Sequence, residues 1–223
     1  KKSVYSCINQ KTKYNYEIIV VDDGSKDKSL QILKSIKSKK LRIFSVNNFG
    51  IEKASNLGFK ESKGEYVVRV DSDDHLHRNF VQLMLNKIVG SKYSFVYPSY
   101  HLISKTGKFI KEMALPDFNK KEILERGDFL ATGTIFKKKL LKSLGYYNEL
   151  HKNCGLENYE LIIKILKRNK KGKHVNKFLF YYRRHNKNLS LVKQKKINNY
   201  GINLFKKMKI GKYQVNNFNP AFR

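Results

Sequence analysis

Three carboxylates follow directly on one short apolar run, and this arrangement constrains the fold more than any other stretch of the chain. The run covers residues 65–70, between Gly64 and the acids Asp71, Asp73 and Asp74. It is too short for a helix and is rich in valine, so it predicts a buried strand of a parallel sheet. The acids then lie at the carboxyl edge of that sheet, where open α/β sheets bind their ligands.

The clustered acids predict a metal site. Neighbouring carboxylates repel one another unless a cation offsets their charge, and hard divalent ions prefer oxygen ligands of this kind. The alternative interpretation is a polar loop over residues 71–74 that only ends the strand and begins the next helix.

Strand-like and helix-like stretches alternate along the first half of the chain, a pattern typical of a parallel α/β sheet. Further strands are expected at residues 17–23, 41–46, 95–103, 109–113 and 178–182. Helices are expected at residues 3–10, 54–61, 80–89, 136–144 and 159–167, with one more that carries Leu30, Leu33 and Ile36 on one face. The strands at 95–103 and 109–113 flank a turn at Thr106 and Gly107, which predicts an antiparallel pair.

The chain is strongly basic, because 47 lysines and arginines stand against 18 acidic residues and give a net charge of +29. A field of this sign attracts phosphates, anionic lipid headgroups and nucleic acid. The interpretation as a nucleic-acid-binding protein rests on charge alone, since the chain has no recognised binding module. Nucleic acid is therefore not the expected partner.

The two cysteines, Cys7 and Cys154, lie far apart in the sequence. They form neither a disulfide framework nor a metal cluster, which suits a reducing compartment. No apolar run reaches the length of a membrane span, and the start of the chain lacks the core of a signal peptide. These features predict a cytoplasmic protein.

Five stretches occur in the order and spacing of a known family. They are residues 16–25, 48–58, 64–74, 155–161 and 181–185. Together they resemble the inverting glycosyltransferases of family 2, over roughly residues 3–190. The resemblance implies the α/β fold called GT-A, a Rossmann-like, mostly parallel sheet flanked by helices, over residues 1–190. A basic C-terminal extension would then follow over residues 191–223.

The resemblance also implies an activity. Family members transfer a sugar, of hexosyl type, from a nucleotide-diphosphosugar to an acceptor hydroxyl with inversion, and they use a divalent metal, Mn²⁺ or Mg²⁺. A UDP-sugar is the expected donor, and a glycan or a lipid-linked molecule is the expected acceptor. The alternative is a catalytically impaired relative that binds a nucleotide sugar or a partner without turnover.

The donor site and the metal site follow residue by residue from the family motifs. Asp22 and Asp23 end a strand, and Asp23 matches the aspartate that accepts a hydrogen bond from the donor's base; uracil, with its imide N–H, suits a carboxylate acceptor. Asp71 and Asp73 match the Asp-X-Asp motif, and His185 matches the late histidine that completes the metal site. Each has a simpler interpretation: Asp23 as a helix cap, His185 as a solvated loop residue.

The catalytic base is where this chain departs from the family pattern. Family members carry an aspartate at the position occupied here by Asn158, and an amide cannot accept the acceptor's proton near neutral pH. Glu157 is adjacent and is the remaining candidate, although one residue on a helix turns the side chain by about 100°. The simpler interpretation of Asn158 is a cap of the helix expected at 159–167.

A second departure concerns the sheet. Family members open with an apolar strand and a nucleotide-contacting loop, and this chain begins inside the helix that follows them, which suggests N-terminal truncation. Without that strand, we expect that no strand lies between the strands at residues 18–21 and 67–70 and pairs with both. We expect this departure and Asn158 to weaken the enzyme.

Three further stretches have open roles. Residues 131–136, centred on Gly133, resemble the family's loop near the acceptor, or form an ordinary turn. Arg69 and Arg184 are candidates for steering the anionic donor. The extension over 191–223 mixes lysines with apolar residues and is either a segment that lies on an anionic membrane, peripheral on its inner face, or a solvated tail.

Overall fold

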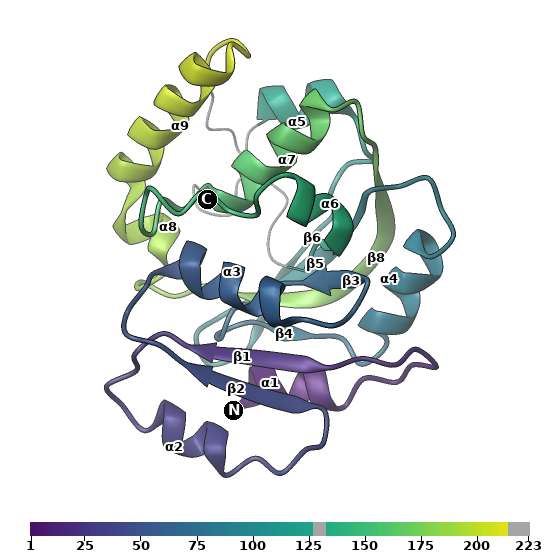
Figure 1. Cartoon of the computed structure of the whole chain (residues 1–223), viewed down its shortest axis with the longest axis vertical. Helices are drawn as coiled ribbons and strands as arrows, with labels where there is room; N and C mark the ends of the chain where they lie inside the picture. Colours follow the sequence, from purple (N-terminus) through teal and green to yellow (C-terminus); the bar gives the residue numbers. More distant parts are fainter. Residues whose placement is uncertain (127–132, 214–223) are drawn as a thin grey trace.

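The computed structural model describes residues 1–126 and 133–213. Its helices are α1 (Lys2–Ile8), α2 (Ser29–Lys34), α3 (Ile51–Glu61), α4 (Phe80–Ile88), α5 (Lys120–Arg126), α6 (Lys138–Ser143), α7 (Glu157–Lys167), α8 (Leu189–Val192) and α9 (Gln194–Met208). Its strands are β1 (Ile18–Asp22), β2 (Leu41–Ser45), β3 (Tyr66–Val68), β4 (His75–Leu76), β5 (Phe95–Ile103), β6 (Phe109–Met113), β7 (Ile135–Lys137) and β8 (Gly172–Arg183). The expected α/β class is confirmed (Figure 1).

The described strands form two sheets. β1 and β2 make a parallel pair, and the other six strands run in the order β3-β7-β5-β8-β4, with β6 paired to β5. Within the larger sheet only β5 and β8 are parallel among the described pairings, and the other four are antiparallel. The predicted mostly parallel sheet, with a parallel strand before Asp71, is therefore wrong for this sheet. An apolar run indicates burial on both faces, but the connections decide strand direction.

The two strands that end on acids lie in different sheets. β1 pairs with β2, whereas β3 pairs with β7, so in the described part of the chain they share no neighbour. This confirms the expectation for residues 18–21 and 67–70. The antiparallel pair of β5 and β6 is confirmed as well.

The stretch at 136–144, expected to be one helix, is a strand followed by a helix. Ile135 and Phe136 are buried between two strands, since β7 pairs with β3 on one side and with β5 on the other. The helix begins only at Lys138. Local sequence did not show this, because the strand is fixed by pairing with partners distant in the chain.

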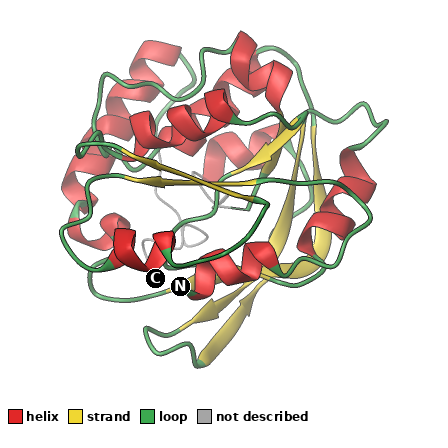
Figure 2. Cartoon of the chain, turned by 60° about the horizontal axis from the view of Figure 1, so that its bottom comes forward, coloured by secondary structure: helices red, strands yellow, loops and turns green. Residues whose placement is uncertain are grey.

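Helix α7 lies at the centre of the packing. Eight of its eleven residues are buried, which leaves it without a solvated face of normal width. On one side it meets α9, where the rings of Tyr159 and Phe205 lie 6.0 Å apart. Helices lie on both sides of the strands in Figure 2, and α9 runs beside α7 in Figure 1.

The C-terminal extension is part of this packing over its described residues. Ile197, Leu204 and Phe205 of α9 belong to the buried core, so these side chains contact protein. Gly155, with φ of +74°, makes close contact with α9: an added Cβ would lie 2.7 Å from Ile197 Cδ1. No helix in the described ranges is both long and apolar enough to cross a membrane.

Candidate functional site

The carboxyl end of β1 supplies Asp22 and Asp23. Asp22 is buried and accepts hydrogen bonds from Ser25 N and the Ser45 hydroxyl. Asp23 accepts from the backbone N–H groups of Phe49 and Gly50, the latter at 2.8 Å, and so holds the entrance to α3. The simpler interpretation of Asp23, a cap of the helix after its own turn, is therefore wrong, because its carboxylate bonds the segment before α3 instead. A carboxylate has about four acceptor positions, so this role leaves room for a ligand N–H.

The turn between β3 and β4 carries the Asp-X-Asp motif and is held from two sides. From α1, the Ser3 hydroxyl donates to Asp71 O at 3.1 Å, and the Ser6 hydroxyl accepts from Leu76 N at 3.0 Å. From the end of β8, Arg183 Nε donates to Asp73 O at 2.8 Å. Segments distant in the sequence therefore fix the backbone of this turn.

Asp74 belongs to the support of the turn. It is 2% exposed, and its Oδ1 accepts from Arg183 N at 2.8 Å. This contact is with the end of β8, whereas the N-cap position of the next helix, α4, is Asn79.

Asp73, on the turn between β3 and β4, lies against His185, which follows β8. His185 Nε2 lies 3.0 Å from Asp73 Oδ2, and both side chains are partly exposed. Lys187 N donates to His185 Nδ1, which leaves the ring proton of a neutral His185 on Nε2, directed at Asp73. Carboxylate oxygen and imidazole nitrogen are ligands for divalent ions, and a bound ion would replace this proton. This mixed oxygen and nitrogen donor set fits Mn²⁺, and it fits Mg²⁺ less well because Mg²⁺ prefers oxygen ligands.

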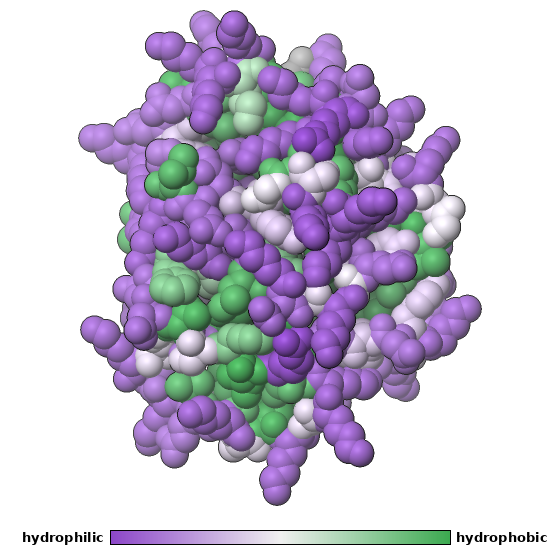
Figure 3. All heavy atoms as spheres, viewed as in Figure 1, coloured by the Kyte–Doolittle hydropathy of each residue, from purple (hydrophilic) through white to green (hydrophobic). Residues whose placement is uncertain are grey.

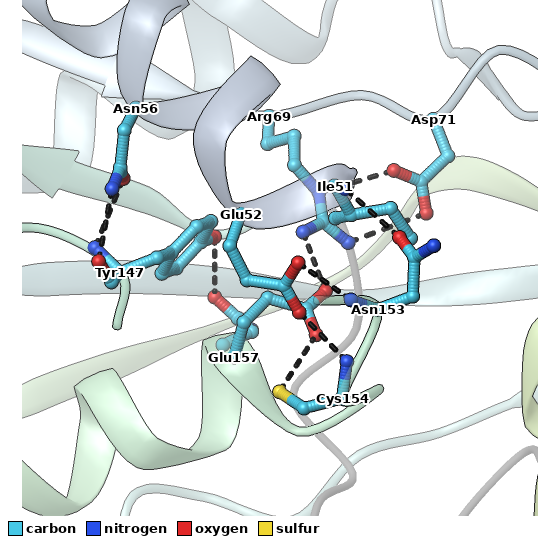
Figure 4. A network of polar contacts seen from close by, with 10 residues as sticks. Ile51, Glu52, Asn56, Arg69, Asp71, Tyr147, Asn153, Cys154 and Glu157 are labelled. Carbon is cyan, nitrogen blue, oxygen red and sulfur yellow. Dashed lines mark hydrogen bonds and ion pairs between the residues drawn. The ribbon is translucent and has the colours of Figure 1, made fainter. Parts of the chain in front are cut away.

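Asp71 is paired with Arg69 (Figure 4). Arg69 Nε lies 3.0 Å from Asp71 Oδ1, and Nη1 of the same guanidinium donates to Glu157 Oε1 at 2.7 Å. Burial opposes the charge of Arg69, but Asp71, Tyr147 and Glu157 keep the pKa of its guanidinium well above the usual value. The protein around Asp71 removes part of its hydration and so raises the pKa of its carboxyl, even though Arg69 favours the charged form. Arg69 is thus engaged with protein carboxylates, which differs from the expected steering role.

Glu157 also belongs to a second cluster, with Glu52 and Cys154. The three are buried, and their ligand atoms lie within 4.8 Å of one another. Both oxygens of Glu52 already accept backbone hydrogen bonds, from Asn153 N at 2.8 Å and Cys154 N at 2.7 Å. Burial raises the pKa of the Cys154 thiol far above its usual range. Because Arg69 supplies the positive charge here, the cluster serves structure: it fastens the loop before α7 to α3.

Asn158 lies inside α7, whose N-cap position is Leu156. The predicted capping role of Asn158 is therefore wrong, because the helix begins two residues earlier than expected. Its Oδ1 accepts from the Tyr147 hydroxyl at 3.3 Å. Tyr147 is in turn fixed by Asn56, which bonds both its N–H and its carbonyl, at 3.0 and 2.9 Å.

The loop centred on Gly133 is described from that residue onward, and Ala131 and Thr132 lie outside the described residues. Gly133 has φ of +91° and donates its N–H to Arg69 O at 3.1 Å. An added Cβ would lie 3.2 Å from the Phe180 ring. The conformation and this close approach both explain the glycine.

The structure therefore gathers Asp71, Asp73, His185 and Glu157 around one turn. Sequence reasoning missed Arg183, Glu52 and Tyr147, which support this turn and the loop before α7. Glu52 in the first turn of a helix gave a weak signal, since acids are common there. Arg183 lies in the family stretch at residues 181–185, but that stretch does not show its role, and Tyr147 gave no signal; the partners of both are distant in the chain.

Comparison with known proteins finds a family over residues 1–145, described as Glycosyl transferase family 2. The match includes the strand ends that carry Asp23, Asp71 and Asp73 and stops before Glu157.

Similar proteins include several glycosyltransferases. One of Methanocaldococcus jannaschii is 27% identical over 214 residues, which are 90% of this chain and 71% of that protein. The hyaluronan synthase of Pasteurella multocida is 29% identical over 203 residues, which are 88% of this chain and 20% of the synthase. A glycosyltransferase of Rickettsia bellii is 34% identical over 119 residues, and the match spans 53% of this chain but only 17% of that protein.

Solved structures of S. aureus TarS, residues 1–349, share the fold. The complex with UDP has a TM-score of 0.64 at 18% identity and covers 92% of this chain and 67% of that one. The complex with UDP-GlcNAc has a TM-score of 0.63 at 21% identity, and the match covers 82% of this chain and 54% of that one. These likenesses confirm the GT-A fold class expected from the sequence.

Proposed function

Because this chain belongs to glycosyl transferase family 2, we propose that it transfers a hexosyl group from a UDP-sugar to an acceptor hydroxyl, with inversion at the anomeric carbon. The observation that carries the proposal is the contact of Asp73 with His185 at 3.0 Å, next to Asp71 on the same turn. Structures that share the fold were solved with UDP and with UDP-GlcNAc, which supports a donor of this class.

Each residue of the turn has a proposed part. Asp73 and His185 would hold a divalent ion, and Asp71, whose side chain is 38% exposed, would contact the ion or the ribose. A bound divalent ion supplies positive charge for the diphosphate leaving group. Asp22 would shape the nucleotide site through its contacts with Ser25 and Ser45, while Asp23 would accept the imide N–H of uracil.

Glu157 is the proposed base. Its Oε1 accepts from Arg69 Nη1 at 2.7 Å, and its carboxylate would accept the proton of an acceptor hydroxyl. Asn158, beside it, cannot replace it in this role. The alternative function, binding of a nucleotide sugar without turnover, rests on Asn158, and the comparisons with glycosyltransferases do not favour it.

The acceptor is proposed to be a glycan or a lipid-linked molecule, and the site of action the cytoplasm or the inner membrane face. The extension supports a peripheral position through the exposed Lys195 and through Val192 and Ile202, which are 65% and 55% exposed. These side chains remain available, whereas the apolar residues of α9 that pack on the core do not.

The proposal is tested by titrating UDP into the protein by calorimetry, with and without Mn²⁺, in two matched variants. Asp73→Ala should abolish the Mn²⁺-dependent part of UDP binding with little change in melting temperature, because its side chain is 35% exposed. Asp74→Ala should weaken that part only slightly. It leaves Arg183 N–H without this acceptor, which costs about 1–3 kcal/mol and lowers the melting temperature by roughly 2–12 °C.

Turnover of UDP-sugars by the wild type, followed by anomer analysis of the product, completes the test. Equal loss of Mn²⁺-dependent binding in both variants would reject the ligand assignment. Metal-dependent UDP binding without turnover, tried over several UDP-sugars and acceptors, would favour the alternative of a binding protein.

A further inference from the structure

Arg69 joins two acids that come from distant parts of the chain. It directly follows β3, and its partner Glu157 lies 88 positions later, in the first turn of α7. The guanidinium contacts Asp71 through Nε at 3.0 Å and Nη2 at 3.4 Å, and it contacts Glu157 through Nη1 at 2.7 Å. Figure 4 shows the guanidinium between the two carboxylates.

The surroundings of Arg69 leave it little freedom. Its side chain is 18% exposed, and its guanidinium lies 5.7 Å from the centre of the Tyr147 ring. Its own carbonyl accepts from Gly133 N. A planar guanidinium with donors in a fixed fork can hold two carboxylates at a set mutual position, which a lysine ammonium cannot do.

We propose that Arg69 is a positioning residue of the proposed transferase. Its fork sets Glu157, the proposed base, relative to Asp71 of the Asp-X-Asp turn. This inference rests on the proposed function. The proposed role depends on the geometry of the guanidinium and not only on its charge, and Arg69 acts through Glu157.

The test uses Arg69→Lys, which keeps the cation but removes the fork. We expect kcat to fall by about 10- to 100-fold, the usual effect of losing a side chain that orients a site. The Kd of UDP in the presence of Mn²⁺, measured by calorimetry, should change by less than about threefold, since the local charge is unchanged. Arg69→Met, which also removes the charge, should lower kcat at least as far.

The double variant Arg69→Lys with Glu157→Gln tests whether Arg69 acts through Glu157. If it does, the kcat of the double variant matches that of Glu157→Gln alone within about twofold, because residues that act as a unit are not additive. Independent losses that multiply would overturn the inference.

The chain provides a matched control in Arg42. It also bridges two carboxylates, with Nη1 3.2 Å from Glu17 and Nη2 3.2 Å from Glu61, away from the turn. Arg42→Lys should keep kcat within about twofold of the wild type, as expected for a partly exposed pair. All variants are assayed well below their melting temperatures, so that a lower kcat is not caused by unfolding. If Arg69→Met fails to fold, the kcat of Arg69→Lys alone tests the proposal.

The possible outcomes separate the two proposals. If the wild type turns over a UDP-sugar and Arg69→Lys retains its kcat, the positioning role is wrong and the proposed function stands. If the wild type neither binds UDP nor turns over a UDP-sugar, the proposed function is wrong and the role of Arg69 falls with it.

Discussion

Exposure separates the carboxylates of the site into two groups. Asp71 and Asp73 keep 38% and 35% of their side chains exposed, whereas the Glu157 side chain keeps 6%. Asp74 and Glu52 are almost completely buried and accept backbone hydrogen bonds. A carboxylate that already accepts buried N–H groups cannot leave them without cost. Asp74 and Glu52 therefore support the loops, and Asp71 and Asp73 are the acids of the turn that can reach a metal ion or the donor.

At Asn158 we predict a gain of function. Asn158→Asp should keep the contact with the Tyr147 hydroxyl, because a carboxylate oxygen accepts as an amide oxygen does. A base restored at this position would raise kcat at saturating donor, with about 10²- to 10⁴-fold as the ceiling. Steady-state kinetics with Asn158→Ala as control measures it.

Glu157 limits that gain, because the proposed base remains beside residue 158. We therefore expect Asn158→Asp to yield a small fraction of the ceiling. A wild type that already turns over at rates typical of an unimpaired enzyme, with no gain in Asn158→Asp, would contradict the prediction and leave Glu157 or another group as sufficient base.

Among the structural elements, β5 and β8 are joined by a buried polar network as well as by backbone pairing. Ser99 Oγ lies 3.0 Å from His174 Nε2 and accepts from Leu115 N at 3.0 Å. Asp117 lies 3.4 Å from His174 Nδ1, and the His174 ring stacks on Tyr97. Ser99 is completely buried, so the arrangement fastens the segment after β6 to the sheet and offers no nucleophile to a substrate.

This network predicts a pH-dependent stability. Burial lowers the pKa of His174 below its usual 6.5, with a further contribution from Lys173, although Asp117 opposes the shift. The unfolded chain then binds the proton more readily, so stability is complete above about pH 6.5 and is lost as the pH falls below it. His174→Gln, which does not titrate, should lose less stability than the wild type between pH 7 and pH 5.

Urea unfolding at the two pH values checks this prediction. His151→Gln, at an exposed position, serves as the control and should behave as the wild type does. An identical loss of stability in wild type and His174→Gln would assign the pH dependence to other groups.

For the molecule as a whole, the net charge of +29 is distributed widely. In Figure 3 polar side chains cover most of the face drawn. One basic hollow of about 480 Å³ is lined by Val192, Lys193, Lys195, Lys196 and Asn199, at the start of α9. Such a hollow combines positive charge with one exposed apolar side chain, as a surface that contacts anionic lipid would.

We therefore predict that the start of α9 contributes more to binding of anionic vesicles than other basic stretches do. Replacing Lys193, Lys195 and Lys196 by Gln should weaken binding by about 100-fold, from about 1 kcal/mol per lysine near the surface. Replacing Lys34, Lys37 and Lys39 by Gln removes the same charge elsewhere and should have a smaller effect. Vesicle sedimentation measures both; equal effects, or binding that is indifferent to anionic lipid, would reject the idea.

The sequence by itself determined the local elements and the turn chemistry. Short apolar runs predicted β1, β2 and β3, and the acids at their ends placed Asp23, Asp71 and Asp73 in turns, because hydrophobic period and turn residues act within a few positions. The family motifs added His185, and the structure brings it to Asp73.

The tertiary structure alone decided strand direction and the partners of each acid. β7 became a strand because β3 and β5 lie on its two sides, and no local pattern in 135–137 fixes this pairing. Glu157 meets Arg69, and Asp74 meets Arg183, across 88 and 109 positions. Such contacts depend on how the elements pack, and burial gives them their strength, since an ion pair or hydrogen bond is strong only where water is excluded.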